Sequence, residues 1–317
     1  MPSRRRLGVA LVLDPPVRDE VQGLRRALGD PWLQRVSPHL TLIPPVNVRS
    51  ADLAAGLEVL RSAAAVQAGL LRITLGPPAT FLPDNPVLFL EVGGEIERLR
   101  QLRDAVFRSP LERPLSWPWV PHVTLADGIE ENRIASAVQS LDRYAAVADF
   151  DRVVILEETR GRVWKALADA RLGPPAVVGT GGLAVRITQG RVPDPLALQA
   201  IEADEEAKSS WTQIAEALDS SVPQPIVLTA HRGNEMLGTG ALWRSPAGAH
   251  AAVFVVPDGR REGTGGHLLA QLESAAAEAG WDDPFVTAIG PAGFYESRSA
   301  WIRPATRTQR TRTGRAS

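Results

Sequence analysis

The chain of 317 residues contains no cysteine, which excludes disulfides and thiolate metal sites and fits a reducing cytoplasm. Its net charge is only −1, so we expect no overall electrostatic attraction to nucleic acid or to an anionic membrane. No apolar run approaches the roughly 20 residues that a membrane helix needs. The run at 7–13 is short and is followed by Asp14, Pro15 and Pro16. It therefore predicts a first strand and not a signal peptide.

A five-residue pattern occurs twice in the first half of the chain. Residues 38–42 read Pro-His-Leu-Thr-Leu, and residues 121–125 read Pro-His-Val-Thr-Leu. The chain has only five histidines, so chance is a poor explanation for two of them sharing this context. In a strand, side chains alternate between the two faces. Each copy therefore buries its aliphatic residues on one face and presents a histidine and a threonine on the other.

Two such strands, side by side, would place two imidazoles and two hydroxyls over one cavity. One neutral imidazole can accept a proton while the other, protonated, donates one, because the pKa of histidine lies near neutrality. The threonine hydroxyls can hydrogen-bond the oxygens of a phosphate held between the rings. A metal site is less well supported, because two histidines without cysteine or a carboxylate at ligand spacing leave a metal under-coordinated.

The order of predicted elements indicates two domains. For the first, the pattern predicts strands at 7–13, 37–43, 70–76, 86–92, 120–126, 153–156 and 163–168. Each prolyl pair is expected to end a strand, so that 37–43 stops at Pro44 and a loop covers 77–86. Helices are predicted around 17–28, 53–60, 96–106 and 134–141. The two His-Thr strands thus fall in two similar halves of one domain.

A Pro- and Gly-rich stretch marks the predicted boundary. We expect a first domain at 1–173, a linker at 174–182, a second domain at 183–302 and a disordered Arg/Thr-rich tail at 303–317. For the second domain the pattern predicts strands at 183–187, 226–230, 236–243, 251–256 and 285–289, and helices at 195–206, 209–219 and 267–279.

The paired motifs resemble those of the 2H phosphoesterase superfamily, which includes 2′-5′ RNA ligase-like proteins and cyclic phosphodiesterases. The resemblance covers residues 7–170 and implies an α+β domain of two lobes in pseudo-two-fold relation. It implies that His39 and His122 form a metal-independent acid–base pair, with His122 as base and His39 as acid in hydrolysis. Thr41 and Thr124 would bind the phosphate. The substrates implied are cyclic or 2′-5′ phosphodiesters of nucleotides or RNA ends.

One position departs from the RNA-ligase-like pattern. Those members often have arginine shortly after the second motif, and here the residue is Asp127. A cation expected near the phosphate is therefore missing from its usual place, which argues against ligation. Arg113 or Lys165 could replace it.

A second signal is a glycine-rich turn between an apolar strand and a helix. Glycines allow a phosphate to approach the backbone, and the free amides at a helix start favour anions. The pattern Arg-x-x-Gly-x-Gly resembles the acetyl-CoA pyrophosphate loop of GNAT acetyltransferases, and the element order of 183–302 is similar to their mixed α/β domain. The resemblance implies acetyl-CoA as cofactor, Tyr295 as a general acid for the thiolate, and a cofactor loop of Val256, Arg260, Arg261, Gly263, Thr264, Gly265 and Gly266.

These observations predict a two-domain cytoplasmic enzyme: a phosphoesterase that needs no cofactor, fused to an acetyltransferase-like domain. The expected partners are a nucleotide or RNA end and acetyl-CoA, with no membrane. One alternative is a nucleotide- or RNA-binding module without turnover. Another is an acetyltransferase whose N-terminal domain only presents the substrate. The sequence does not define the oligomeric state.

Overall fold

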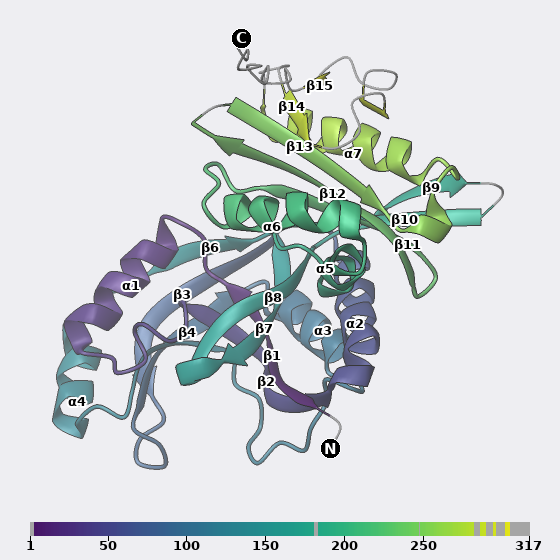
Figure 1. Ribbon diagram of the computed structural model, residues 1–317. Coiled ribbons are helices and arrows are strands. Elements are labelled where there is room, and N and C mark those ends of the chain that lie inside the picture. Colours follow the sequence, from purple (N-terminus) through teal and green to yellow (C-terminus); the bar gives the residue numbers. More distant parts are fainter. Residues whose placement is uncertain are drawn as a thin grey trace, which may run out of the picture. The chain divides into compact units, whose positions relative to one another are not determined.

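The computed structural model describes residues 3–180, 183–246, 248–281, 286–289, 294–295 and 302–304 (Figure 1). The chain divides into two compact units. The N-terminal unit comprises residues 1–176 together with 188–195, and the C-terminal unit comprises 177–187 and 196–317. The boundary thus falls inside the stretch expected to be a linker, and a short later segment returns to the first unit.

The N-terminal unit contains one eight-stranded sheet with the strand order β6-β3-β4-β5-β2-β1-β7-β8. The strands are β1 (Arg4–Val12), β2 (His39–Arg49), β3 (Leu71–Thr80), β4 (Val87–Gly94), β5 (His122–Asp127), β6 (Ala146–Phe150), β7 (Arg152–Thr159) and β8 (Val163–Arg171). The helices are α1 (Val17–Leu28), α2 (Leu53–Ala65), α3 (Ile96–Val106) and α4 (Glu131–Ser140), with short 3-10 turns η1 (Ser50–Asp52) and η2 (Arg160–Arg162). This is an α+β fold, as predicted.

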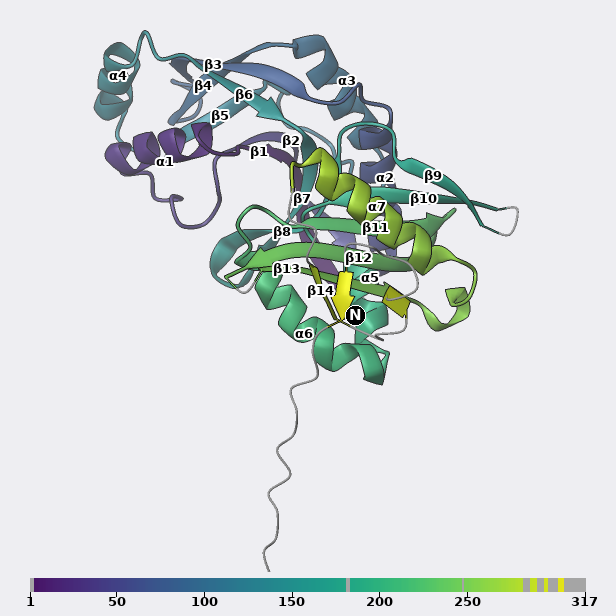
Figure 2. The ribbon, with the colours of Figure 1, turned by 90° about the horizontal axis from the view of Figure 1, so that it is seen from above.

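The strand order is symmetric about the junction of β2 and β5. Strand β1 flanks β2 as β4 flanks β5. The strand that follows α2, β3, lies next to β4 of the second half, and β7 lies next to β1 of the first half. Helices α1 and α4 lie side by side, as do α2 and α3 (Figures 1 and 2). The two predicted halves therefore exchange a strand, and the two His-Thr strands meet at the centre of the sheet.

Two of the prolyl pairs do not end their strands, contrary to the prediction, whereas β1 does end before Pro15 and Pro16, at Val12. Strand β2 continues through Pro44 and Pro45 to Arg49, and β3 continues through Pro77 and Pro78. Both pairs fall where the register with the neighbouring strand shifts, between the pairs Val9↔Ile43 and Leu7↔Val46 in β2. A bulge removes the ladder hydrogen bonds that proline cannot donate, so the strand can resume beyond it.

The C-terminal unit contains a seven-stranded sheet in the order β15-β14-β13-β12-β11-β10-β9. Its strands are β9 (Ala176–Thr180), β10 (Leu183–Gly190), β11 (Ile226–Arg232), β12 (Glu235–Ser245), β13 (Gly248–Val255), β14 (Val286–Ile289) and β15 (Ile302–Pro304). Its helices are α5 (Pro195–Glu202), α6 (Glu205–Asp219) and α7 (Thr264–Glu278), with the 3-10 turn η3 (Pro257–Gly259). Strands β13 and β14 are parallel, whereas β11 to β13 are antiparallel.

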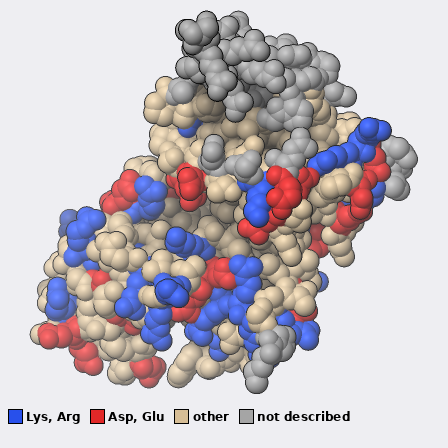
Figure 3. All heavy atoms as spheres, in the orientation of Figure 1, with Lys and Arg blue, Asp and Glu red and all other residues tan. Residues whose placement is uncertain are grey.

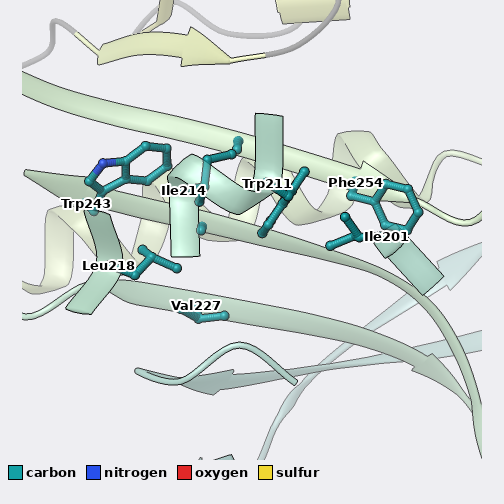
Figure 4. Packing of buried hydrophobic residues seen from close by; sticks show 9 residues of the cluster. Ile201, Trp211, Ile214, Leu218, Val227, Trp243 and Phe254 are labelled. Atoms are coloured by element: carbon teal, nitrogen blue, oxygen red, sulfur yellow. The ribbon is translucent and has the colours of Figure 1, made fainter. Parts of the chain in front are cut away.

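A buried cluster of aromatic and aliphatic side chains joins this second sheet to α5 and α6. Trp211 of α6, Trp243 of β12 and Phe254 of β13 pack together with Ile201 of α5 (Figure 4). Helix α7 packs against the same strands, where Gly240 leaves room for Leu272. A methyl group at Gly240 would come within 3.0 Å of the Leu272 side chain. The small residues of β12 thus allow a helix to lie close to the sheet.

Several boundaries in this unit differ from the prediction. Part of the expected linker forms β9, because Val177 and Val178 favour a strand. The first predicted helix ends at Glu202, and Asp204 caps the next one by accepting a hydrogen bond from Ala207 N at 3.1 Å. Helix α7 begins three residues earlier than predicted, at Thr264. The predicted tail lies outside the described residues beyond 304.

No helix within the described ranges is long and apolar enough to cross a membrane.

Candidate active site

The two His-Thr motifs meet through a single register pair. Strands β2 and β5 run antiparallel, with Leu40 opposite Val123. Continuing this register places His39 opposite Thr124, and Thr41 opposite His122. The two histidines are then diagonal neighbours, a relation that separates Cα atoms by about 7–8 Å in an antiparallel pair. The predicted pairing of two imidazoles and two hydroxyls is therefore compatible with the geometry of the sheet.

The strand alternation expected from the sequence is present in both motifs. Leu40, Leu42, Val123 and Leu125 are fully buried. His39, Thr41, His122 and Thr124 are partly buried on the opposite face. Each histidine is the first residue of its strand and follows a proline. The apolar residues thus anchor the strands, and the polar residues remain accessible on the other side.

Both imidazoles are held in the same way. His39 Nδ1 lies 2.7 Å from Ser37 O, and His122 Nδ1 lies 2.8 Å from Val120 O. A carbonyl oxygen can only accept, so Nδ1 must carry the hydrogen in both rings. In the neutral tautomer, Nε2 then has a lone pair for a substrate proton. Each motif positions its histidine through the carbonyl two residues upstream.

Burial lowers the pKa of both histidines. Burial is the largest cause for His39, whose pKa falls to about 4, and the charges of Arg25 and His122 lower it further. The hydrogen bond to Ser37 opposes this shift. Burial also lowers the pKa of His122, against the hydrogen bond to Val120. Both rings are consequently neutral at pH 7 in the free protein, and an anion between them would favour their protonation.

Two phenylalanines form a wall beside His122. Phe81 meets the imidazole edge-on with ring centroids 5.1 Å apart, and Phe89 of β4 lies at 5.3 Å. The two phenyl rings stack on each other at 4.2 Å. Phe89 and Thr124 are register partners, so this wall stands on the same sheet face as the site. Its apolar surface accounts for part of the desolvation of His122.

A buried ion pair lies in the electrostatic environment of His39. Arg25 of α1 and Asp30 have side chains only 4% and 1% exposed, and Arg25 Nε donates to Asp30 Oδ2 at 2.8 Å. Arg25 also donates to Val36 O at 2.7 Å. The pKa of Asp127 is raised by burial, and the charge of Asp30 raises it further. At the position where a cation was expected, Asp127 therefore places a carboxyl group close to the carboxylate of Asp30.

Arg113 and Lys165, the two suggested replacement cations, make their contacts outside the paired motifs. Arg113 donates to Pro45 O at 2.8 Å and to Pro114 O at 3.3 Å. Lys165 lies opposite Glu157 in the β7–β8 ladder. On the visible face of the N-terminal unit, basic and acidic side chains are interspersed (Figure 3). No group of three or more histidine, aspartate or glutamate side chains that could hold a metal occurs in the described part of the chain.

The glycine-rich turn of the C-terminal unit forms the entry to α7. Arg261 and Gly263 have positive φ angles of 71° and 88°. Thr264 is 1% exposed, and its Oγ1 has no hydrogen-bond partner within the residues described. Gly265 packs against Phe294, which would lie 3.1 Å from an added methyl group. The loop thus turns through left-handed positions into a helix N-terminus, where amide groups favour an anion.

The remaining predicted loop residues have structural contacts. Arg260 donates to Val255 O at 3.1 Å and to Asp204 Oδ2 at 2.5 Å, so its guanidinium group is held at the start of α6. Val256 N donates to Leu237 O at 3.0 Å. Gly266 lies in the first turn of α7.

The hydroxyl of Tyr295 contacts both β13 and β14. Tyr295 is fully buried; its hydroxyl donates to Ile289 O and accepts from Val253 N, both at 3.0 Å. The last pair of the parallel β13–β14 ladder is Ala252↔Ile289, so the tyrosine bridges the strands where their pairing ends. Burial raises its pKa to about 12. Between Ile289 and Ile302, only Phe294 and Tyr295 lie within the described residues.

Comparisons with known proteins agree with the paired motifs. Residues 13–162 match the family model of the 2′-5′ RNA ligase superfamily. A Bacillus pumilus protein provisionally named a phosphoesterase is 26% identical over 134 residues, which is 42% of this chain and 77% of that protein. A similarly named Oceanobacillus iheyensis protein is 24% identical over 168 residues, 52% of this chain and 97% of its own. These matches support the 2H phosphoesterase, or 2′-5′ RNA ligase, superfamily for the N-terminal part of the chain.

The solved structures found by comparison include the apo form of E. coli LigT, with a TM-score of 0.39 and 17% identity over 54% of this chain and 99% of that one. Another is the protein TT0787 of Thermus thermophilus, with a TM-score of 0.38 and 19% identity over 53% and 97%. The family match ends at residue 162 and does not include the C-terminal unit.

Three features of the 2H-like site could not be read from the sequence. Arg25 lies on the buried side of α1, four residues after Val21, where an apolar residue is the usual choice. Phe81 and Phe89 reach His122 only because β3 and β4 fold beside β5. Trp119 lies just before the second motif, and its Nε1 donates to Thr41 O of the first motif at 3.0 Å. This hydrogen bond links the residues just before the second motif to β2, the strand of the first motif.

Proposed function

We propose that the N-terminal unit is a metal-independent phosphoesterase that hydrolyses cyclic or 2′-5′ phosphodiesters of nucleotides or RNA ends. The observation that supports this most is the matched geometry of His39 and His122. Each holds its Nδ1 hydrogen on a backbone carbonyl, and each lies opposite the threonine of the other motif. The names of the Bacillus pumilus and Oceanobacillus iheyensis relatives agree with a phosphoesterase.

In this proposal one imidazole Nε2 accepts a proton from water as the water oxygen attacks phosphorus. The bond from phosphorus to the leaving ribose oxygen breaks, and the other imidazole donates its Nε2 proton to that oxygen. Thr41 and Thr124 bind the non-bridging oxygens. The lower pKa of His39 favours it as the base and His122 as the acid, which reverses the assignment expected from the sequence resemblance. Burial of His39 is the physical reason for the reversal.

The test is a screen of 2′,3′-cyclic nucleotides and RNA ends with the wild-type chain in the presence of a chelator. We expect turnover that is lost in His39→Ala and His122→Ala. Binding of the same nucleotides with no turnover by the wild type would favour a nucleotide-binding module instead. Turnover that persists in both variants would contradict the paired acid–base proposal.

A second activity is proposed for the C-terminal unit: acetyl transfer from acetyl-CoA. It is supported by the left-handed positions at Arg261 and Gly263 and by the unpartnered Thr264 hydroxyl at the start of α7. The backbone of residues 263–266, with Arg261, would hold the pyrophosphate, and the cofactor would supply the acetyl group. Tyr295 has no part in this proposal as an acid, because its proton is hydrogen-bonded to Ile289 O.

The acetyl-CoA proposal is tested by calorimetry with acetyl-CoA and the full chain. Gly263→Val forces a β-branched residue into a left-handed conformation and should abolish binding. Arg260→Ala should weaken binding less, because Arg260 contacts Asp204 and not the loop amides. Binding that is unchanged in Gly263→Val would rule out this loop as the cofactor site.

A further inference from the structure

The loop that leads into the second motif carries an exposed indole. Trp117, between α3 and β5, is 74% exposed. Leu115 and Val120 of the same loop are 37% and 46% exposed. Tryptophan is strongly buried on average, so an indole left this open is informative. The core of the N-terminal unit therefore does not account for the presence of Trp117 in this loop.

Two hydrogen bonds attach this loop to the strand of the first motif. Arg113 Nη1 donates to Pro45 O at 2.8 Å, and Trp119 Nε1 donates to Thr41 O at 3.0 Å. Both acceptors belong to β2, which also carries His39. Trp117 stands between the two anchors in the chain, and its Cα is within about 7 Å of that of Trp119, because two residues span no more. The exposed indole is therefore held near the strand that forms half of the site.

The loop is stiff as well as anchored. Pro114, Pro118 and Pro121 fix three φ angles around Trp117. Arg103 lies over the Trp119 ring at 5.7 Å from the centroid. The carbonyl of Val120 holds the Nδ1 hydrogen of His122. A ligand that stacks on Trp117 would meet a largely pre-ordered partner, which lowers the entropic cost of binding.

The surface around Trp117 suits a flat ligand better than a protein. A protein partner needs an apolar patch of several hundred Å², whereas the exposed apolar residues here, Leu115, Trp117, Pro118 and Val120, all belong to one short loop that Ser116 interrupts. A nucleobase offers a π face that matches a single indole. The other aromatic residues of the site are not available, because Phe89 is only 6% exposed and packs on Phe81 and His122.

We propose that Trp117 is a stacking platform for the nucleobase attached to the phosphodiester that the paired histidines bind. This inference rests on the proposed phosphoesterase function. It assigns recognition of the base of that substrate to one residue and makes Trp117 a specificity-determining residue. A phosphodiester without a base would bind the imidazoles and threonines but gain nothing from the loop.

The test compares the binding of adenosine 2′-monophosphate and of inorganic phosphate to the full chain by calorimetry. Trp117→Ala and Trp117→Leu should weaken nucleotide binding about five-fold or more, since a base–aromatic stack contributes roughly 1–3 kcal/mol. Trp117→Phe should stay near the wild type. Phosphate affinity should be the same in all four proteins. Val147→Ala, a change at another exposed aliphatic residue (54%) of this unit, is the matched control and should change nothing.

Four outcomes would overturn the inference. Trp117→Leu binding the nucleotide as well as the wild type would show an apolar docking surface and no stacking. Equal losses for nucleotide and phosphate would show a distorted loop. No nucleotide binding by the wild type, or no change in any variant, would show that the indole has no such role. His39→Ala and His122→Ala separate this test from the proposed function, because turnover of cyclic nucleotides depends on the histidines and nucleotide affinity on Trp117.

Discussion

Leu40 lies opposite Val123 where β2 and β5 meet, and this pair sets the geometry of the whole candidate site. Both side chains are fully buried. A slip of one residue in this register would turn one motif's histidine into the core and its leucines to the open face of the sheet. The buried aliphatic residues thus determine that each histidine faces the threonine of the other motif.

His39→Ala and His122→Ala should each lower kcat/KM for a 2′,3′-cyclic nucleotide by about 10²–10⁴-fold, because each removes a general acid or base. The double variant should be little worse than either single one, since the two groups act as a unit. Steady-state hydrolysis measured by product release checks this. His267→Ala, a histidine of α7 in the other unit, is the control and should leave the rate unchanged.

The pH profile of hydrolysis should peak on the acid side of 6.5. His39 must be neutral to act as the base, and it is neutral at pH values above its pKa of about 4. His122 must be protonated to act as the acid, and its pKa lies below the ordinary histidine value. The profile of kcat/KM should therefore fall below about pH 4 and again before pH 7. A rate that continues to rise up to pH 8 would contradict this assignment of the two pKa values.

The lowered pKa of His39 also predicts how the stability of the protein depends on pH. The folded state resists protonation of His39, whereas the unfolded chain protonates it near 6.5. The unfolded state therefore binds more protons between pH 6.5 and pH 4, and the free energy of unfolding falls as the pH is lowered through this window. Urea unfolding of the wild type and of His39→Ala across this range checks it. The decline should be shallower in the variant.

Arg25→Met should destabilise the N-terminal unit by about 3–5 kcal/mol, because it leaves the Asp30 carboxylate buried without its partner. The double change Arg25→Met with Asp30→Leu should recover most of this loss. Arg25→Met should also raise the pKa of His39, since the charge of Arg25 lowers it. NMR titration of the His39 ring measures that shift. An unchanged His39 pKa would show that Arg25 does not influence the site.

The candidate site was predictable because its signals are local. The alternation of Leu40, Thr41 and Leu42 gives the buried and open faces of a strand, and the repeat of the motif gives a pair. The register between β2 and β5 could not be predicted from the sequence, because it pairs residues about 80 positions apart. It also could not show that bulges absorb the prolyl pairs at 44–45 and 77–78, since a bulge depends on the neighbouring strand.

The domain boundary illustrates the same limit. The Pro- and Gly-rich composition around residue 174 predicts the end of the first domain, and the first segment of the N-terminal compact unit runs to residue 176. The segment 188–195 nevertheless belongs to the N-terminal unit. Its contacts are charged and distant in sequence: Asp194 pairs with Arg61 of α2, and Arg191 donates to Asp14 at 2.9 Å. No local pattern marks residues that act through partners more than 130 positions away.

These contacts predict that a fragment ending at the expected boundary, residue 173, is less stable than one ending at 195. The Asp169 carboxylate accepts hydrogen bonds from the backbone N of Arg191 and of Val192, the latter at 2.8 Å. The shorter fragment loses these two donors and the Asp194 partner of Arg61, whose side chain is 9% exposed. Removing one member of a buried ion pair costs about 3–5 kcal/mol.

Urea unfolding of the two fragments measures this difference through their transition midpoints. In the longer fragment, Asp194→Ala should reproduce a large part of the loss, because it leaves the buried Arg61 with only the more distant Glu58 carboxylate, at 4.0 Å. Adding Arg61→Met to Asp194→Ala should restore stability, since no charge then remains buried. Equal midpoints for the fragments ending at 173 and 195 would show that residues 188–195 add nothing to the N-terminal unit.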